Sequence, residues 1–150
     1  MLYRMIAVML ACLMAGCATQ SNGASSESAR QQVAETERAF ARTMADRDLN
    51  AFISFLAQDA VFFSGPAPLH GPKAISQFWG RFYSSPAAPF SWAPEEVEVL
   101  SSGNLALSSG PVHNPQGKLI GRFTSIWRLE ADGKWRIVFD KGSEVCDCKQ

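Results

Sequence analysis

Asp140 is the acidic residue whose position in the sequence best fits chemistry. It follows Val138 and Phe139 in a mainly apolar segment that is typical of a β-strand. Partial burial shifts the pKa of a carboxyl group, so such a residue can act as a general base or hold a cationic ligand. The competing interpretation is structural, with Asp140 in an ion pair with Arg122 or Arg136 on the sheet.

The chain has two histidines, His70 and His113, and each lies in an expected loop rich in Pro and Gly. A histidine paired with Asp140 would be able to transfer protons near neutral pH. The candidate catalytic residues are therefore Asp140, His70 and His113. The alternative for each histidine is an exposed loop position without chemistry.

Other catalytic and cofactor signatures are missing from the sequence. It has no Gly-rich phosphate loop, zinc motif, Cys-x-x-Cys pair or Gly-x-Ser-x-Gly elbow. A metal site at the terminal Cys146 and Cys148 would need more ligands than two histidines supply. We expect these two cysteines to form a disulfide within or between chains in an oxidising compartment, or else a tail without a function. No cofactor and no metal are predicted.

The N-terminus has the layout of a secretory signal. Arg4 precedes an apolar run of ten residues, 5–14, which is too short to span a bilayer. Residues 13–17 (LMAGC) resemble a bacterial lipobox, although Met14 stands where Leu is usual. This resemblance implies removal of residues 1–16, acylation of Cys17 and a lipid anchor, with Ala18 pointing to the periplasmic side of the outer membrane. An ordinary secreted protein cut nearby is the alternative. Residues 17–29 read as a tether.

Composition limits the classes of protein to consider. The chain has 150 residues, of which 47% are hydrophobic, with 14 basic and 14 acidic side chains. This length and composition favour a single globular domain. A formal net charge of zero argues against a nucleic-acid-binding protein, which would show a basic excess.

Three helices are expected, each with its own signal. A capping-box pattern starts the first near Ser28, Asp48 caps the second over 49–56, and Pro72 opens the third with a large aromatic face. Strands are expected at 59–63, 95–101, from 105 to a break near Gly110-Pro111, 119–130 and 135–141. This order predicts an α+β fold, with a curved, mostly antiparallel sheet packed on helices of the N-terminal half and a conical pocket at one end.

Two segments resemble a known superfamily. Phe40 to Gly71 (FARTMADRDLNAFISFLAQDAVFFSGPAPLHG) and Gly121 to Asp140 (GRFTSIWRLEADGKWRIVFD) are similar to the ketosteroid-isomerase-like and SnoaL-like branch of the nuclear-transport-factor-2-like superfamily. The resemblance gives a domain over 30–145, followed by a Cys-x-Cys tail at 146–150. Its motifs specify a fold better than an activity.

The resemblance allows a test of isomerase chemistry. That chemistry needs a Tyr, a base and a protonated Asp, and the matching positions here hold Phe40, Ser64 and Ser125. Steroid isomerisation is therefore not expected. If the alignment slipped by a residue or two, Asp59 would be the base; otherwise Asp59 caps an element.

The resemblance also implies a ligand pocket. Alternation puts Gly121, Phe123, Ser125 and Trp127 on one face of the long strand, and the resemblance turns that face to the cavity. It also places Asp140 towards the pocket, on the side opposite Trp135, Ile137 and Phe139. Plain core packing is the alternative. The predicted pocket residues are Phe40, Ser64, Trp79, Trp92, Phe123, Ser125, Trp127 and Asp140.

Three functions remain open from the sequence. The first is non-catalytic binding of a small apolar molecule. The second is an enzyme of the SnoaL-like type, an isomerase, cyclase or hydrolase that uses Asp140 with a histidine. The third is a structural or assembly module that forms a homodimer through the outer face of the sheet.

Overall fold

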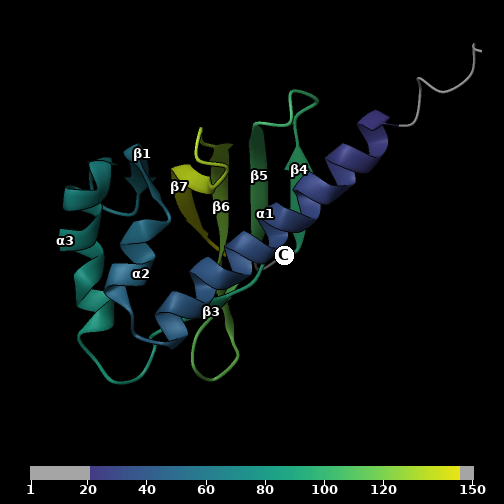
Figure 1. The fold of residues 1–150 in the computed structure, drawn as a ribbon. Coiled ribbons are helices and arrows are strands. Elements are labelled where there is room, and N and C mark those ends of the chain that lie inside the picture. Colours follow the sequence, from purple (N-terminus) through teal and green to yellow (C-terminus); the bar gives the residue numbers. More distant parts are fainter. Residues whose placement is uncertain (1–20, 146–150) are drawn as a thin grey trace, which may run out of the picture.

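The structure, a computed structural model, describes residues 21–145 (Figure 1). The signal segment, Cys17, Cys146 and Cys148 lie outside the described residues. The helices are α1 (Ser21–Ala45), α2 (Leu49–Ser54) and α3 (Gly71–Tyr83). The strands are β1 (Leu56–Phe63), β2 (Leu69–His70), β3 (Ser91–Trp92), β4 (Glu96–Val99), β5 (Leu105–His113), β6 (Leu119–Leu129) and β7 (Trp135–Glu144).

The strands form one curved sheet in the order β2-β1-β7-β6-β5-β3, and β4 also pairs with β5. Only the β1–β7 pair is parallel among these described strands. In Figure 1, α1 runs diagonally across one face of the sheet, with α2 and α3 beside β1. The predicted α+β architecture is confirmed. Two short strands, β2 and β3, were not expected from the sequence.

Helix α1 begins well before the expected start. It is helical from Ser21, so Ser28 lies within the helix, where its hydroxyl accepts a hydrogen bond from Gln32 at 3.4 Å. The part of the expected tether from residue 21 to 29 is therefore helical. No proline interrupts this segment, and each residue added to an existing helix gains one backbone hydrogen bond.

The other helix signals act as expected at their starts. Asp48 caps α2 by accepting the N–H of Ala51 at 2.8 Å, and Pro72 lies in the first turn of α3. The end of α2 was predicted too late. Leu56 is not helical, because it starts β1 and is buried there beside β7.

Strand β5 continues through the expected break. Pro111 pairs with Arg122 of β6, and Gly110 pairs with Phe123. A side chain at position 110 would clash with the carbonyl oxygen of Ala93, so glycine is required there for a close approach and does not end the strand.

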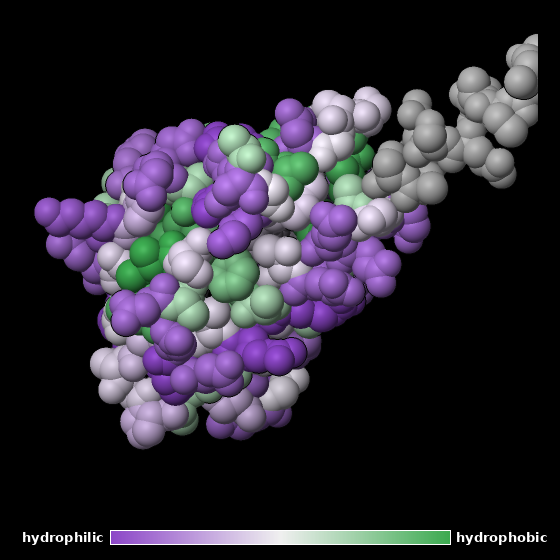
Figure 2. Space-filling view, viewed as in Figure 1, coloured by the Kyte–Doolittle hydropathy of each residue, from purple (hydrophilic) through white to green (hydrophobic). Residues whose placement is uncertain are grey.

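The core lies between the helices and the concave face of the sheet. Its largest fully buried side chains include Phe40, Phe52, Phe62 and Trp127. Figure 2 shows the helix-covered face, which is mostly hydrophilic, with hydrophobic atoms in patches between polar side chains. Within residues 21–145, no helix is long and apolar enough to cross a membrane.

Candidate functional site

An aromatic cavity of ≈ 280 Å³ lies between α1, α3 and the concave face of the sheet. Of the predicted pocket residues, two are fully buried without bordering the cavity, namely Ser125 and Trp127. The remaining six predicted pocket residues do border the cavity, namely Phe40, Ser64, Trp79, Trp92, Phe123 and Asp140. Further lining residues that the sequence did not indicate are Phe63, Phe82, Phe90, Val112 and Gly142.

A larger and more open depression of ≈ 640 Å³ lies elsewhere, between α1 and the β6–β7 turn. It is bordered by polar side chains such as Glu35, Lys134 and Arg136. None of its lining residues is a buried carboxylate. The smaller aromatic cavity is therefore the stronger candidate site.

Asp140 reaches the cavity because β7 contains a bulge. The pairing of β6 with β7 shifts by one residue at Val138, and a bulge of this kind reverses the alternation of side chains. Asp140 therefore lies on the buried face together with Trp135 and Ile137, whereas Phe139 is 48% exposed. The expected position of Asp140 opposite Trp135 and Ile137 was wrong for this reason.

The carboxyl group of Asp140 is buried and has one partner. Its Oδ2 accepts a hydrogen bond of 2.9 Å from the Ser125 hydroxyl, and the residue is 7% exposed. Burial raises the pKa of Asp140 to about 7, and the nearby Glu37 carboxylate adds to this rise. In the described part of the chain, no hydrogen bond reaches the other oxygen, Oδ1.

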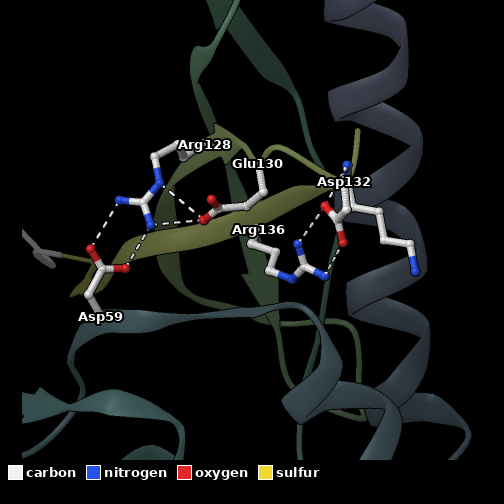
Figure 3. A network of polar contacts seen from close by, with 6 residues as sticks. Asp59, Arg128, Glu130, Asp132 and Arg136 are labelled. Carbon is white, nitrogen blue, oxygen red and sulfur yellow. Dashed lines mark hydrogen bonds and ion pairs between the residues drawn. The ribbon is translucent and has the colours of Figure 1, made fainter.

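Neither arginine proposed as a partner for Asp140 is paired with it. Arg122 forms an ion pair with Glu95 at 2.8 Å. Arg136 forms one with Asp132 at 2.7 Å, at the β6–β7 turn (Figure 3). Asp140 is therefore a cavity carboxyl group and not part of a surface ion pair.

Glu37 is a second buried carboxyl group, and the sequence interpretation missed it. It lies on α1 with no exposed surface. Its Oε1 accepts the indole N–H of Trp92 at 2.8 Å, and its Oε2 accepts the indole N–H of Trp127 at 2.9 Å and the hydroxyl of Ser108. Burial raises the pKa of Glu37, while these hydrogen bonds oppose the rise.

One signal in the sequence does point to Glu37. Val33, Glu37, Phe40 and Met44 are spaced so that they share one face of a helix. An acidic residue inside such an apolar stripe must either break the stripe or be buried with partners. All four side chains are buried in the structure.

The two histidines lie away from the cavity. His70 is exposed at the position before α3, where its side chain forms no capping hydrogen bond. His113 ends β5 and is partly buried. Neither borders the cavity or contacts Asp140 by a hydrogen bond within residues 21–145. The structure therefore does not bring the proposed His–Asp140 pair together.

Asp59 also lies outside the site. Its side chain is 66% exposed and forms a two-pronged ion pair with Arg128 of β6, at 2.7 and 3.0 Å (Figure 3). Hydrogen bonding to Arg128 lowers the pKa of Asp59. A surface carboxylate held in this way is not the base of a buried site.

The described residues offer no evident metal centre. Within residues 21–145, no three side chains of His, Cys, Asp or Glu are grouped so that they could hold a metal ion. The cavity carries one carboxyl group at its surface, Asp140, with Glu37 behind it.

Comparison with known proteins identifies the fold and its relatives. A family profile described as "SnoaL-like domain" matches residues 37–138. No curated protein matches the chain at a significant level.

Several solved structures resemble the chain at low sequence identity. A nuclear-transport-factor-2-like protein of unknown function from Pseudomonas putida has a TM-score of 0.68 at 20% identity, covering 83% of this chain and 92% of its own. A proposed ketosteroid isomerase from Parabacteroides distasonis has a TM-score of 0.58 at 22% sequence identity, and the match covers 71% of this chain and 82% of that protein. A proposed dehydratase from Streptomyces avermitilis has a TM-score of 0.63 at 17% sequence identity, and the match covers 80% of this chain and 98% of that protein. At these identities the likeness shows the fold alone.

Proposed function

Because the chain belongs to the SnoaL-like domain family, we propose that its cavity binds a small, mainly apolar molecule carrying one polar group that contacts Asp140. The observation that carries this proposal is an aromatic cavity of ≈ 280 Å³ with a single buried carboxyl group at its wall. Binding sites for small molecules commonly combine an apolar lining with a few polar groups that fix the orientation of the ligand.

The three positions that match the catalytic groups of a ketosteroid isomerase do not hold those groups. Phe40 has no hydroxyl and stacks on Phe52 with ring centroids 5.0 Å apart. Ser64 accepts a hydrogen bond from the indole of Trp79 at 3.2 Å. Ser125 donates to Asp140. These contacts support a cavity that binds a ligand and does not isomerise steroids.

Acid–base catalysis by Asp140 is a second candidate. Burial raises the pKa of this carboxyl group to about 7, which suits proton transfer at neutral pH. Two of the similar structures are described as a proposed ketosteroid isomerase and a proposed dehydratase, and both descriptions fit such chemistry. In this version Asp140 acts without either histidine, because both lie away from the cavity.

We also propose the location and assembly of the protein from the sequence. The segment 13–17 supports lipidation at Cys17 and a position at the periplasmic face of the outer membrane. Phe63 and Phe139 are both exposed and stack on each other within the chain, with ring centroids 6.5 Å apart. An exposed aromatic pair of this kind supports a homodimer that would bury it. Detection of the diacylglycerol mass on Cys17 would test the first of these proposals.

Filling the cavity tests the binding function. Gly142 borders the cavity, and a Cβ there meets no atom within 4 Å, so Gly142→Leu can place a side chain in the space without a backbone clash. Native mass spectrometry of the wild-type chain is expected to show a co-purified small molecule, and Gly142→Leu is expected to lose it.

Lys141→Leu provides the matched control. It adds a leucine at the neighbouring position, which is exposed, so it is expected to retain the molecule. Equal binding of small apolar molecules by the wild type and by Gly142→Leu, followed by tryptophan fluorescence, would contradict a site in this cavity.

A further inference from the structure

Within the part of the chain that the structure describes, the two buried carboxyl groups have no positively charged partner. Asp140 and Glu37 receive hydrogen bonds from neutral groups, namely hydroxyls and indole N–H groups. The ion pairs found within residues 21–145 all involve other acidic residues. Among these described residues, no Lys, Arg or His borders the cavity. Negative charge at this site is therefore left without a protein counter-charge.

The two indole hydrogen-bond donors at the cavity wall are already engaged. The indole N–H of Trp79 donates to Ser64, and that of Trp92 donates to Glu37. The Ser125 hydroxyl donates to Asp140. What remains for a ligand is the hydroxyl proton of Ser64 and, beside the buried carboxyl group, an acceptor, Oδ1 of Asp140. At Asp140, a ligand that supplies a donor fits better than one that supplies an acceptor.

The apolar walls also favour a positive charge. Trp79, Phe82 and Phe90 stand nearly perpendicular to one another, with interplanar angles of 76°, 83° and 76° and ring centroids 5.2 to 6.1 Å apart. Aromatic rings have negative faces, which attract organic cations. One face of Phe82 is already covered by the guanidinium group of Arg81, 4.6 Å from the ring centroid, so Trp79 and Phe90 are the rings left for a ligand cation. An anionic ligand would meet both these rings and the carboxyl groups.

From these observations we infer that the cavity takes an organic cation, a small amine with an apolar substituent, whose ammonium group lies against Asp140 and whose apolar part lies among the rings of Trp79, Phe82 and Phe90. This inference rests on the proposed binding function and names its ligand class. The ammonium N–H groups would occupy Oδ1 of Asp140, and the charge would compensate the carboxylate of that residue. Without the cation, the Asp140 carboxylate has no positive charge beside it in the cavity.

A charge series on one ring system tests the inference. Phenethylamine, 2-phenylethanol and phenylacetate have similar sizes and differ in charge. We expect the full-length protein at pH 8 to bind phenethylamine at least about tenfold more tightly than 2-phenylethanol, with phenylacetate weakest. Calorimetry and the fluorescence of Trp79 and Trp92 would report binding.

Two variants assign the preference to Asp140. Asp140→Asn keeps the size of the side chain and its ability to accept the Ser125 hydroxyl, but it removes the charge. We expect it to lose the preference for phenethylamine and to keep its affinity for 2-phenylethanol. Glu96→Gln, which removes one charge at an exposed position of β4, is expected to leave all three affinities unchanged.

The outcomes separate this inference from the function on which it rests. If the wild type bound 2-phenylethanol or phenylacetate as tightly as phenethylamine, the cation inference would be wrong while the binding function stood. The same holds if Asp140→Asn kept the preference for the amine. If none of the three probes bound the wild type, or if all bound Gly142→Leu equally well, both proposals would fail.

Discussion

The Ser125 hydroxyl on β6 donates a hydrogen bond of 2.9 Å to Oδ2 of Asp140, which lies directly opposite it on β7. Both residues are buried. This contact fixes the position of the carboxyl group at the cavity wall and leaves its other oxygen for a ligand. It also stabilises the ionised form of Asp140, against the larger effect of burial.

The pH dependence of stability should reveal Asp140. Its pKa is about 7 in the folded state and near 3.8 when exposed, so folding takes up a proton between these two values. The free energy of unfolding should therefore fall as the pH rises from about 4 to 7, by up to about 4 kcal/mol from this residue. Glu37, whose pKa is also raised, acts in the same direction.

Urea unfolding of the wild type and of Asp140→Asn at pH 5 and pH 8 measures this effect. We expect Asp140→Asn to be more stable than the wild type at pH 8 and to show a flatter dependence on pH. The exposed Glu96→Gln serves as the control and should follow the wild type. A wild type that gains stability from pH 5 to pH 8, relative to Asp140→Asn, would show that Asp140 is not the residue described here.

Removing the Ser125 hydroxyl should raise the pKa of Asp140 further. Ser125→Ala deletes the hydrogen bond that favours the ionised carboxylate. Carbon-13 NMR of the Asp140 carboxyl carbon, titrated from pH 4 to 9, would measure the change. Thr124→Ala on the neighbouring outward position should leave the titration as in the wild type, and an unchanged midpoint in Ser125→Ala would remove Ser125 from the site.

Glu37 should be required for stability as well as for the electrostatics of the cavity. Glu37→Ala leaves the indoles of Trp92 and Trp127 and the hydroxyl of Ser108 without their acceptor in the core. We expect a loss of about 2–4 kcal/mol in the free energy of unfolding, because buried unpaired donors are costly. Glu35→Ala, at an exposed position of α1, should cost less than about 0.5 kcal/mol.

Phe139 provides a test of the proposed homodimer. Its ring is 48% exposed and packs against Phe63. Light scattering at micromolar concentration should give a dimer for the wild type and a monomer for Phe139→Glu, because a buried unpaired charge would weaken the interface. A wild-type monomer under these conditions would argue against the assembly.

The parts of this molecule that follow from short-range rules could be predicted from the sequence. The Asp48 cap, the proline in the first turn of α3 and the alternation of Phe123, Ser125 and Trp127 depend on neighbours within a few residues. These rules also gave the α+β class, which the comparisons support.

The rest depends on contacts between distant segments. The partners of Glu37 lie 55, 71 and 90 residues further along the chain, on β3, β5 and β6. No local pattern names them. The bulge at Val138 is set by how β7 fits against β6. The resemblance implied that Asp140 faces the pocket from the side opposite Trp135 and Ile137, and the bulge could not be anticipated from it. The two histidines were predicted to act with Asp140 because imidazole suits proton transfer. Residue type alone does not determine position, and neither His70 nor His113 borders the cavity.

The position of β7 in the sheet determines when the sheet can form during synthesis. This strand is the last of the described strands along the sequence, yet it lies between β1 and β6 and joins them. A nascent polypeptide that stops before residue 135 therefore lacks the element that links its first strand to the others. Pairing over such long separations is slow. The sheet therefore cannot be completed before residues 135–144 have been synthesised.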